Sequence, residues 1–204
     1  MASRVLLATR SGGKIRELRA LLEGAGIEVI GLDEARIAPR PEEDCLESAT
    51  TFEENALAKA RYFQRISRLP TVADDSGLCV DALGGAPGVH SKRWSGRPDL
   101  DGQALDDANN ALLLARLAGA ATRRARYVCA AAYYDGEREL VERGEVAGEI
   151  LESARGRGGF GYDPYFFSYE LGRTFAEVSV EEKARVSHRA RAFRKLVARL
   201  GSGD

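Results

Sequence analysis

The stretch RVLLATRSGGKIRELRALLEGAGIEVIGL, residues 4–32, sets the fold class of this chain. It begins with an apolar run of strand length and continues through a glycine-containing turn. Apolar residues then recur at the spacing of one helix face, and an alternating apolar run follows Gly26. A strand, a helix and a strand in succession predict an α/β protein.

The rest of the chain continues this mixture of strands and helices. Capping-box patterns at Thr51 and Glu54 and again at Ser179 predict a helix to about residue 66 and a terminal helix. Two strands are expected on either side of a turn at Ser76-Gly77. Asp135-Gly136 between apolar runs predicts a hairpin. The pattern therefore predicts a mixed β-sheet with flanking helices.

Composition and charge narrow the classes of function. With 204 residues, of which 44% are hydrophobic and 30% charged, the chain can bury a core in one domain or two closely joined lobes. A formal charge of −1 excludes a global field that would draw the chain to nucleic acid or to an anionic membrane. The three cysteines form no Cys-x-x-Cys pair, which disfavours both a disulfide framework and a structural zinc site.

The lengths of the apolar runs and of the linkers indicate where the protein works and how many domains it has. No apolar run has the length of a membrane span or of a signal peptide, so we expect a cytoplasmic protein with no membrane or nucleic-acid partner. No linker is long enough to separate independent domains, so we expect a single domain of two lobes over residues 1–204. Residues 201–204, which read GSGD, are expected to form a disordered tail.

The segment TRSGGK, residues 9–14, joins the first strand to the first helix. A glycine-containing turn at a helix N-terminus directs backbone N–H groups and partial positive charge outward, which favours a phosphate ligand. Lys14 adds a full charge. The segment is not a Walker A loop, because Ala8 and Ile15 stand where that motif has glycine and serine or threonine. A plain strand-to-helix turn explains the segment equally well.

Two adjacent carboxylates, Asp74 and Asp75, follow an apolar run. A strand alternates its side chains, so the two are predicted to point to opposite faces and to do different jobs. At a strand end beside a turn, such carboxylates are suited to hold Mg²⁺ and to act as general base toward water. A solvated turn in which the aspartates cap backbone N–H groups is the alternative.

Two later segments carry aromatic and basic residues. In GRGGFGYDPYFF, residues 156–167, glycines surround Phe160 and Tyr162, so a ring can stack on a base, although a hairpin-type loop with buried aromatics is the alternative. Further on, His188 and Arg189 offer hydrogen-bond donors, which favour a ligand edge rich in acceptors such as a 6-oxo purine. A solvated basic helix face is the alternative there.

Taken in order, five segments resemble one family and cover essentially the whole chain. They are LATRSGGKIREL, TTFEENALAKA, ADDSGLCVDALGGAPGVHSKRWSG, GGFGYDPYFF and EEKARVSHRARA. The chain resembles the inosine/xanthosine triphosphate pyrophosphatase family, the Ham1-like hydrolases of non-canonical purine nucleoside triphosphates. The resemblance implies an elongated two-lobed α/β structure with a central substrate cleft, usually as a homodimer. It also implies a single catalytic domain and Mg²⁺-dependent hydrolysis of ITP, dITP or XTP to a nucleoside monophosphate and pyrophosphate.

The resemblance also implies roles for individual residues. Asp75 is implied to act on water and, together with Glu47, to bind the metal. The first of the segments would contact the triphosphate, and the last two would recognise the base. The implied substrate-binding residues are Thr9, Arg10, Ser11, Gly12, Gly13, Lys14, Asn55, Ser76, Phe160, Gly161, Tyr162, Asp163, Lys183, His188 and Arg189.

Two departures from the family pattern affect these roles. Ser11 stands where the family usually has asparagine, which shortens a polar side chain near the phosphates. The acidic loop before Thr51 is locally longer than usual, so Glu42 or Glu43 is an alternative to Glu47 at the metal. Two other functions stay open, namely a Maf-like pyrophosphatase for other modified nucleotides and a non-catalytic nucleotide- or RNA-binding protein.

Overall fold

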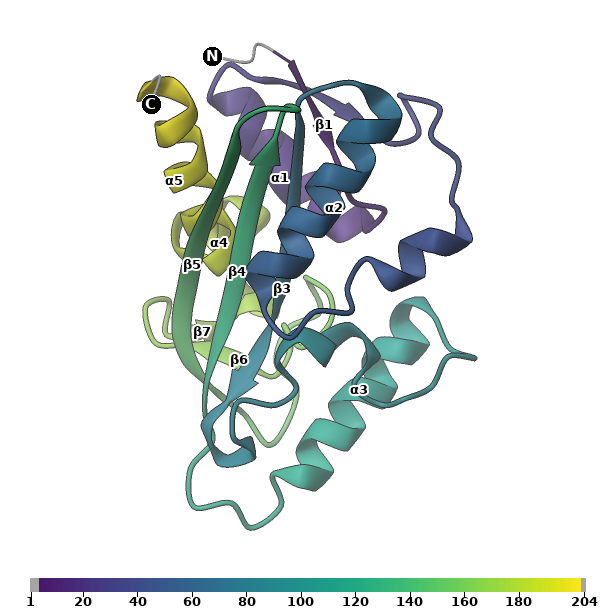
Figure 1. Ribbon diagram of the computed structural model, residues 1–204. Helices are drawn as coiled ribbons and strands as arrows, with labels where there is room; N and C mark the ends of the chain where they lie inside the picture. The colour runs from purple at the N-terminus through teal and green to yellow at the C-terminus, as the bar shows by residue number, and fades with distance from the viewer. Residues whose placement is uncertain (1–3, 203–204) are drawn as a thin grey trace. The chain divides into compact units, whose positions relative to one another are not determined.

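The computed structural model describes residues 4–202 and contains a mixed sheet with helices beside it (Figure 1). Within these residues the seven-stranded sheet has the order β2-β1-β3-β4-β5-β6-β7. The strands are β1 Arg4–Leu7, β2 Glu28–Gly31, β3 Thr71–Val80, β4 Arg124–Tyr134, β5 Glu139–Ile150, β6 Phe166–Ser168 and β7 Arg173–Thr174. β1 runs parallel to β2 and β3, whereas β6 is antiparallel to β5 and β7, so the predicted mixed sheet is confirmed.

The described chain divides into two compact units. Unit 1 comprises residues 4–75, 129–144 and 188–202, and unit 2 comprises residues 76–128 and 145–187. Each α-helix belongs to one unit. Unit 1 contains α1 Gly12–Gly24, α2 Phe52–Ser67 and α5 His188–Ser202, and unit 2 contains α3 Gly102–Arg116 and α4 Val180–Val186.

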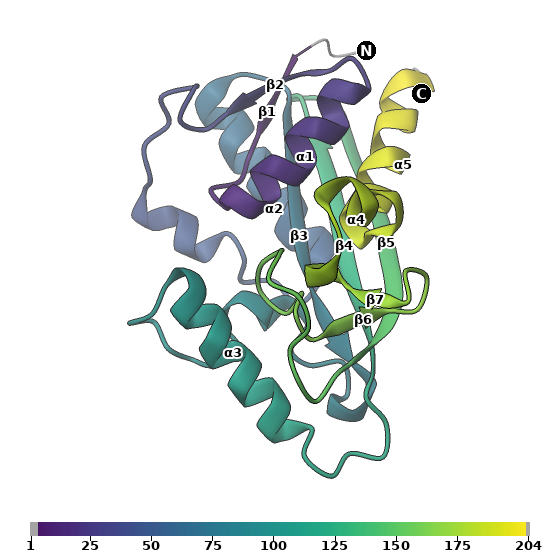
Figure 2. The same ribbon diagram turned by 180° about the vertical axis from the view of Figure 1, so that it is seen from behind.

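Unit 1 carries helices on both faces of its part of the sheet. α1 and α5 cover one face and α2 covers the other, as the two opposite views show (Figures 1 and 2). Leu18 and Leu22 of α1 and Phe193 of α5 pack with Val72 of β3 in one apolar cluster. Leu18 and Leu22 lie one helical turn apart, which is why their spacing in the sequence predicted this helix.

Unit 2 has a separate core that is rich in aromatic rings. The rings of Tyr127, Phe166 and Phe175 contact one another, with centroids 4.6 to 5.9 Å apart. Leu113 of α3 and Tyr162 of the glycine-rich loop belong to the same cluster. The alternative in which aromatics of this loop are buried therefore holds for Tyr162.

Three local features differ from the sequence prediction. β3 continues through Ser76-Gly77, so the predicted turn there is wrong; the strand pairs with β1 and β4 and is buried along nearly its whole length, which overrides the local turn preference. At Ser187 the backbone is extended and separates α4 from α5. α5 extends to Ser202, so two residues of the expected tail are helical, and residues 203–204 lie outside the described residues.

Between residues 4 and 202, no helix combines the length and the apolar character that are needed to cross a bilayer.

Candidate functional site

The paired aspartates lie in the middle of β3, where both side chains are buried. Asp75 faces α2, because Asn55 and Lys59 of that helix contact its carboxylate. Asp74 faces α1 and α5, because Lys14 and Arg189 contact its carboxylate. The predicted alternation is therefore confirmed, although the pair belongs to a strand interior rather than to a strand end.

The α2 side of β3 gathers two carboxylates around one buried lysine. The Lys59 ammonium group donates hydrogen bonds to Glu47 Oε1 at 2.6 Å and to the backbone oxygen of Asp74 at 2.5 Å. It lies 3.8 Å from Asp75 Oδ1. Asn55 Nδ2 donates to Asp75 Oδ2 at 2.9 Å. Asn55 and Lys59 are four residues apart on α2, so one helix face places both on the same carboxylate.

The electrostatics of this cluster set the protonation of its members. Burial raises the pKa of Asp75 above its usual range; Lys59 opposes this rise and the Glu47 carboxylate adds to it. Burial lowers the pKa of Lys59, but attraction to Glu47 and the two aspartates outweighs burial and raises it. Lys59 therefore stays protonated at neutral pH, and Asp75 becomes a better proton acceptor than an exposed aspartate.

The opposite side of β3 holds Asp74 in a buried network of cations. Lys14 Nζ lies 2.9 Å and Arg189 Nε 3.2 Å from Asp74 Oδ2, and Arg189 Nη1 donates to Glu17 Oε2 at 2.5 Å. Burial alone would raise the pKa of Asp74, but Lys14, Arg189 and Lys59 outweigh burial and hold it well below its usual range. Asp74 is thus an ionised residue that fixes the position of two cations.

The TRSGGK segment begins α1. Ser11 is the N-cap of the helix, and its side chain accepts the backbone N–H of Lys14. Thr9 Oγ1 accepts the backbone N–H of Ser11 at 3.2 Å. Serine is a good N-cap residue, so the departure from the usual asparagine preserves the start of the helix. Gly12 and Gly13 form its first turn, and Lys14 follows them into the contact with Asp74.

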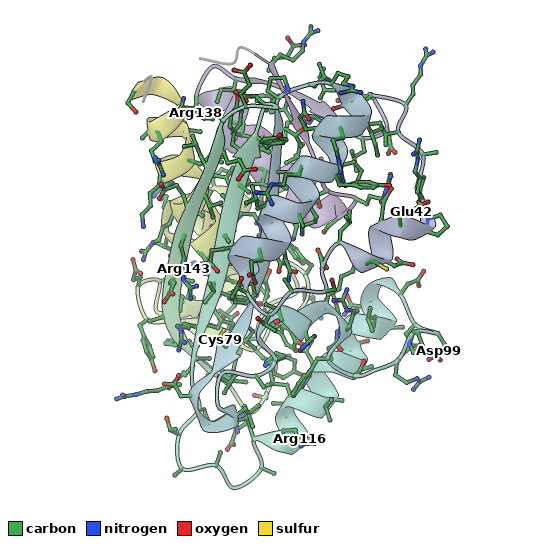
Figure 3. The ribbon with its side chains drawn as sticks, in the orientation of Figure 1. Glu42, Cys79, Asp99, Arg116, Arg138 and Arg143 are labelled. Carbon is green, nitrogen blue, oxygen red and sulfur yellow. The ribbon has the colours of Figure 1, made fainter. Side chains whose placement is uncertain are left out.

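The three acidic candidates for the metal differ in their surroundings. Glu47 shares Lys59 with Asp75. Glu43 instead accepts two hydrogen bonds from Arg10, each at 2.7 Å. Glu42 is exposed on the short helical turn Pro41–Cys45 (Figure 3). Among these three, Glu47 is therefore the carboxylate that lies beside Asp75.

Unit 2 organises the glycine-rich loop around Asp163. The Asp163 Oδ2 atom accepts the backbone N–H of Phe160 at 3.0 Å and a hydrogen bond from Lys183 Nζ at 2.6 Å. Lys183 also lies 5.0 Å from the centroid of the Phe160 ring, within the range of a cation–π interaction. At Gly159, whose φ is 74°, an added Cβ would collide with the Asp163 carboxylate, so the loop requires glycine there.

The predicted site residues thus form two groups. Unit 1 holds those of the TRSGGK segment together with Glu47, Asn55, Asp75, His188 and Arg189. His188 is buried at the start of α5, where β5 approaches so closely that a Cβ at Gly144 would collide with the His188 carbonyl oxygen. Unit 2 holds the other members, Ser76, Phe160, Gly161, Tyr162, Asp163 and Lys183.

Two residues that contact the predicted site residues of unit 1, Lys59 and Glu17, were not predicted from the sequence. Lys59 lies on the α2 face defined by Phe52, Ala56 and Phe63, all of which are buried, so a lysine at that spacing was a detectable signal. Glu17 carried no comparable signal, because an acidic residue on a surface helix is ordinary.

The carboxylates on the α2 side of β3 offer the oxygen atoms that a hard metal ion requires of its protein ligands. In the described part of the chain, no three His, Cys, Asp or Glu side chains come together in a way that would hold a metal ion by themselves. Two carboxylates that lie close together, as Asp75 of β3 and Glu47 do around Lys59, can however share a cation with a phosphate ligand. Fold and cluster together define an α/β protein with a buried acidic cluster beside the middle of β3.

The chain belongs to the Ham1 family, whose family model matches residues 5–199. A protein named dITP/XTP pyrophosphatase from Aromatoleum aromaticum is 49% identical over 205 residues, which cover 99% of this chain and 98% of that protein. One of the same name from Burkholderia pseudomallei is 48% identical, with 98% and 94% covered. The solved structure of a HAM1 protein from Coxiella burnetii has a TM-score of 0.83 and 34% identity, covering 99% of this chain and 100% of that one. The resemblance inferred from the five segments is confirmed.

Proposed function

We propose that this chain hydrolyses the non-canonical purine nucleoside triphosphates ITP, dITP and XTP to a nucleoside monophosphate and pyrophosphate. The observation that carries the proposal is the setting of Asp75, a buried carboxylate on a central strand that Asn55 orients and Lys59 links to Glu47. Membership of the Ham1 family and relatives named dITP/XTP pyrophosphatase support the same reaction class. Removal of such nucleotides would cleanse the nucleotide pool.

In the proposed reaction, Asp75 is the residue that accepts a proton from the attacking water. A water oxygen bonds to the α-phosphorus, the bond from that phosphorus to the α,β-bridging oxygen breaks, and pyrophosphate leaves. The Asp75 carboxylate accepts the proton that the water loses, and its raised pKa brings its basicity closer to neutral pH. Asn55 holds Oδ2 of the carboxylate by donating a hydrogen bond, which fixes the direction from which Asp75 meets the water.

The residues present fit a magnesium ion as cofactor. Mg²⁺ commonly binds one or two protein carboxylates and completes its shell with water and substrate phosphates, so a full protein cage is not needed. Asp75 and Glu47 would hold the ion, since both contact Lys59 and each adds negative charge near the other. When bound, Mg²⁺ would offset the charge of the phosphates.

The triphosphate would meet the N-terminus of α1. Residues 9–14 bring a helix start and the Lys14 ammonium group together on the α1 side of β3, and both attract phosphate oxygens. Arg10 belongs to the same segment and is bound to Glu43 in this structure. Its contact with the substrate stays a prediction.

The base would be recognised by the glycine-rich loop and by the donors of Lys183, His188 and Arg189. Phe160 offers a ring for stacking, and Lys183 is held beside it by Asp163. Donors satisfy a 6-oxo group but leave themselves unpaired against the 6-amino group of adenine, at a cost of about 1–3 kcal/mol for each buried group. We therefore propose that ITP and XTP are preferred over ATP.

A panel of nucleoside triphosphates tests the proposal. With Mg²⁺ present, dITP, ITP and XTP should yield monophosphate and pyrophosphate with kcat/KM well above that for ATP or dUTP. Equal kcat/KM for ATP and ITP would contradict the base specificity, and preference for dUTP would support the Maf-like alternative. Nucleotide or RNA binding without any product would support the non-catalytic alternative.

The resemblance leads to two further proposals about the protein as a whole. We propose that it is a homodimer and that it works in the cytoplasm, in keeping with a freely diffusing nucleotide substrate. Light scattering during size-exclusion chromatography measures the mass. A monomer that is fully active at assay concentration would contradict the first of these proposals.

A further inference from the structure

Two side chains of α3 hold the glycine-rich loop at one residue. Asp106 Oδ2 accepts the backbone N–H of Gly161 at 2.7 Å, and Asn110 Nδ2 donates to the Gly161 carbonyl oxygen at 2.9 Å. Asp106 and Asn110 are four residues apart and share one face of α3, which follows Asp99 and ends at Arg116 in Figure 3. A single helix face therefore holds both the N–H and the carbonyl oxygen of Gly161. These two hydrogen bonds, from Asp106 and Asn110, are called the Gly161 clamp below.

The Gly161 clamp sets the loop conformation beside Phe160. Gly161 has a φ of 63°, in the left-handed region, and it is the next residue after Phe160. On the N-terminal side of the Phe160 ring, the backbone N–H of Phe160 donates a hydrogen bond to the Asp163 carboxylate. The peptide that carries the Phe160 ring is thus anchored from both directions, so the ring position depends on the Asp106 and Asn110 contacts.

The burial and charge of the two clamp residues agree with this role. Asn110 is only 5% exposed, and within residues 4–202 its Oδ1 atom has no hydrogen-bond partner, so the contact with Gly161 orients the amide group. Burial raises the pKa of Asp106, the Gly161 N–H opposes this, and the neighbouring Asp163 carboxylate raises it further. Asp106 and Asp163 therefore act on the same short stretch of backbone from different elements.

We propose that Asp106 and Asn110 are positioning residues that set the Phe160 ring for stacking on the purine base. The inference rests on the proposed function, because it assigns these residues to the base end of the substrate. They act through the loop rather than on the reacting phosphates. Their loss should therefore raise KM far more than it lowers kcat.

Steady-state kinetics with dITP and Mg²⁺ test the assignment. Asp106→Ala should raise KM about tenfold while kcat changes by less than about threefold, because one charge-assisted hydrogen bond to the loop is lost. Asp106→Asn keeps an acceptor oxygen at the same distance and should restore KM to within about threefold of the native value. Asp107→Ala is the matched control, since Asp107 is an exposed neighbour whose hydrogen bond is to Gln103, and it should leave both constants unchanged.

A double-mutant cycle with Phe160→Ala shows whether the effect passes through the ring. If it does, Asp106→Ala should add little to the KM of Phe160→Ala. If the KM increases of the two single variants multiply in the double variant, the inference is overturned. It is also overturned if Phe160→Ala raises KM while Asp106→Ala, like Asp107→Ala, leaves KM unchanged. An unchanged KM in Phe160→Ala itself would overturn the proposed base pocket and this inference with it.

An independent variant avoids reliance on Asp106 alone. Asn110→Asp keeps the side-chain size but sets a carboxylate oxygen against the Gly161 carbonyl oxygen, so it should raise the KM for dITP in the same way. Thermal melting of each variant separates loss of the loop contact from loss of folding. A folded Asn110→Asp variant with the native KM would overturn the inference.

Discussion

Replacement of Lys59 by methionine removes the cation that the Glu47 and Asp75 carboxylates share. Lys59 is buried, and Glu47 Oε1 and Asp75 Oδ1 lie 2.6 and 3.8 Å from its ammonium group. Removing one partner of a buried ion pair costs about 3 kcal/mol or more, because the remaining charges are left uncompensated. For a chain of this size each kcal/mol corresponds to roughly 2–4 °C, so the Tm should fall by roughly 6–12 °C.

Arg61 on the same helix provides the matched control for this experiment. Its ion pair with Glu139 is exposed, and an exposed pair contributes about 1 kcal/mol at most. Arg61→Met should therefore melt within roughly 4 °C of the native protein. If calorimetry found Lys59→Met and Arg61→Met equally stable, the reasoning that places Lys59 at the centre of a buried cluster would be refuted.

The same Lys59→Met variant should change the pH profile. Lys59 lowers the pKa of Asp75, whereas burial and Glu47 raise it, so removal of Lys59 moves the pKa of Asp75 further upward. Asp75 accepts a proton only when it is ionised. The acidic limb of the kcat/KM profile should therefore move to higher pH, and a shift to lower pH would contradict the assignment of Asp75 as the base.

Two further variants test other parts of the structure. Because the folded-state pKa of Asp74 is depressed, its contribution to stability is full above the unfolded-state pKa and is lost as pH falls toward the folded-state pKa. Urea titrations of Asp74→Asn should therefore show a weaker loss of stability below about pH 4 than the native protein shows. An unchanged pH dependence would mean that the surrounding cations do not lower the pKa of Asp74. Gly159→Ala should lower the Tm more than Gly161→Ala, because both have positive φ but only the former would collide with Asp163; equal losses in calorimetry would remove the collision from the account.

The elements that the sequence predicted are those whose signals are local. The capping-box patterns predicted the helix starts at Thr51 and Ser179, and alternation along a strand predicted that Asp74 and Asp75 lie on opposite faces. These features depend on a few neighbouring residues, so tertiary packing did not have to be known in advance.

The features that were not predicted depend on partners distant in the sequence. The local turn preference of Ser76-Gly77 lost to strand pairing on both sides of β3. The contact of Arg189 with Glu17 joins α5 to α1, which are far apart in the sequence, and the hydrogen bonds that hold Gly161 come from α3. Lys59 alone offered a local signal, because it interrupts an apolar helix face.

The central claim is that Asp75 accepts the proton of the attacking water. Lys59 keeps the Glu47 carboxylate and the Asp74 backbone oxygen as partners when Asp75 is replaced, so Asp75→Asn should remain folded. Pyrophosphate release from dITP with Mg²⁺ by this folded variant is the most direct measurement. We expect a fall of at least about a hundredfold, which is the contribution of a general base. Near-native release by folded Asp75→Asn would contradict it.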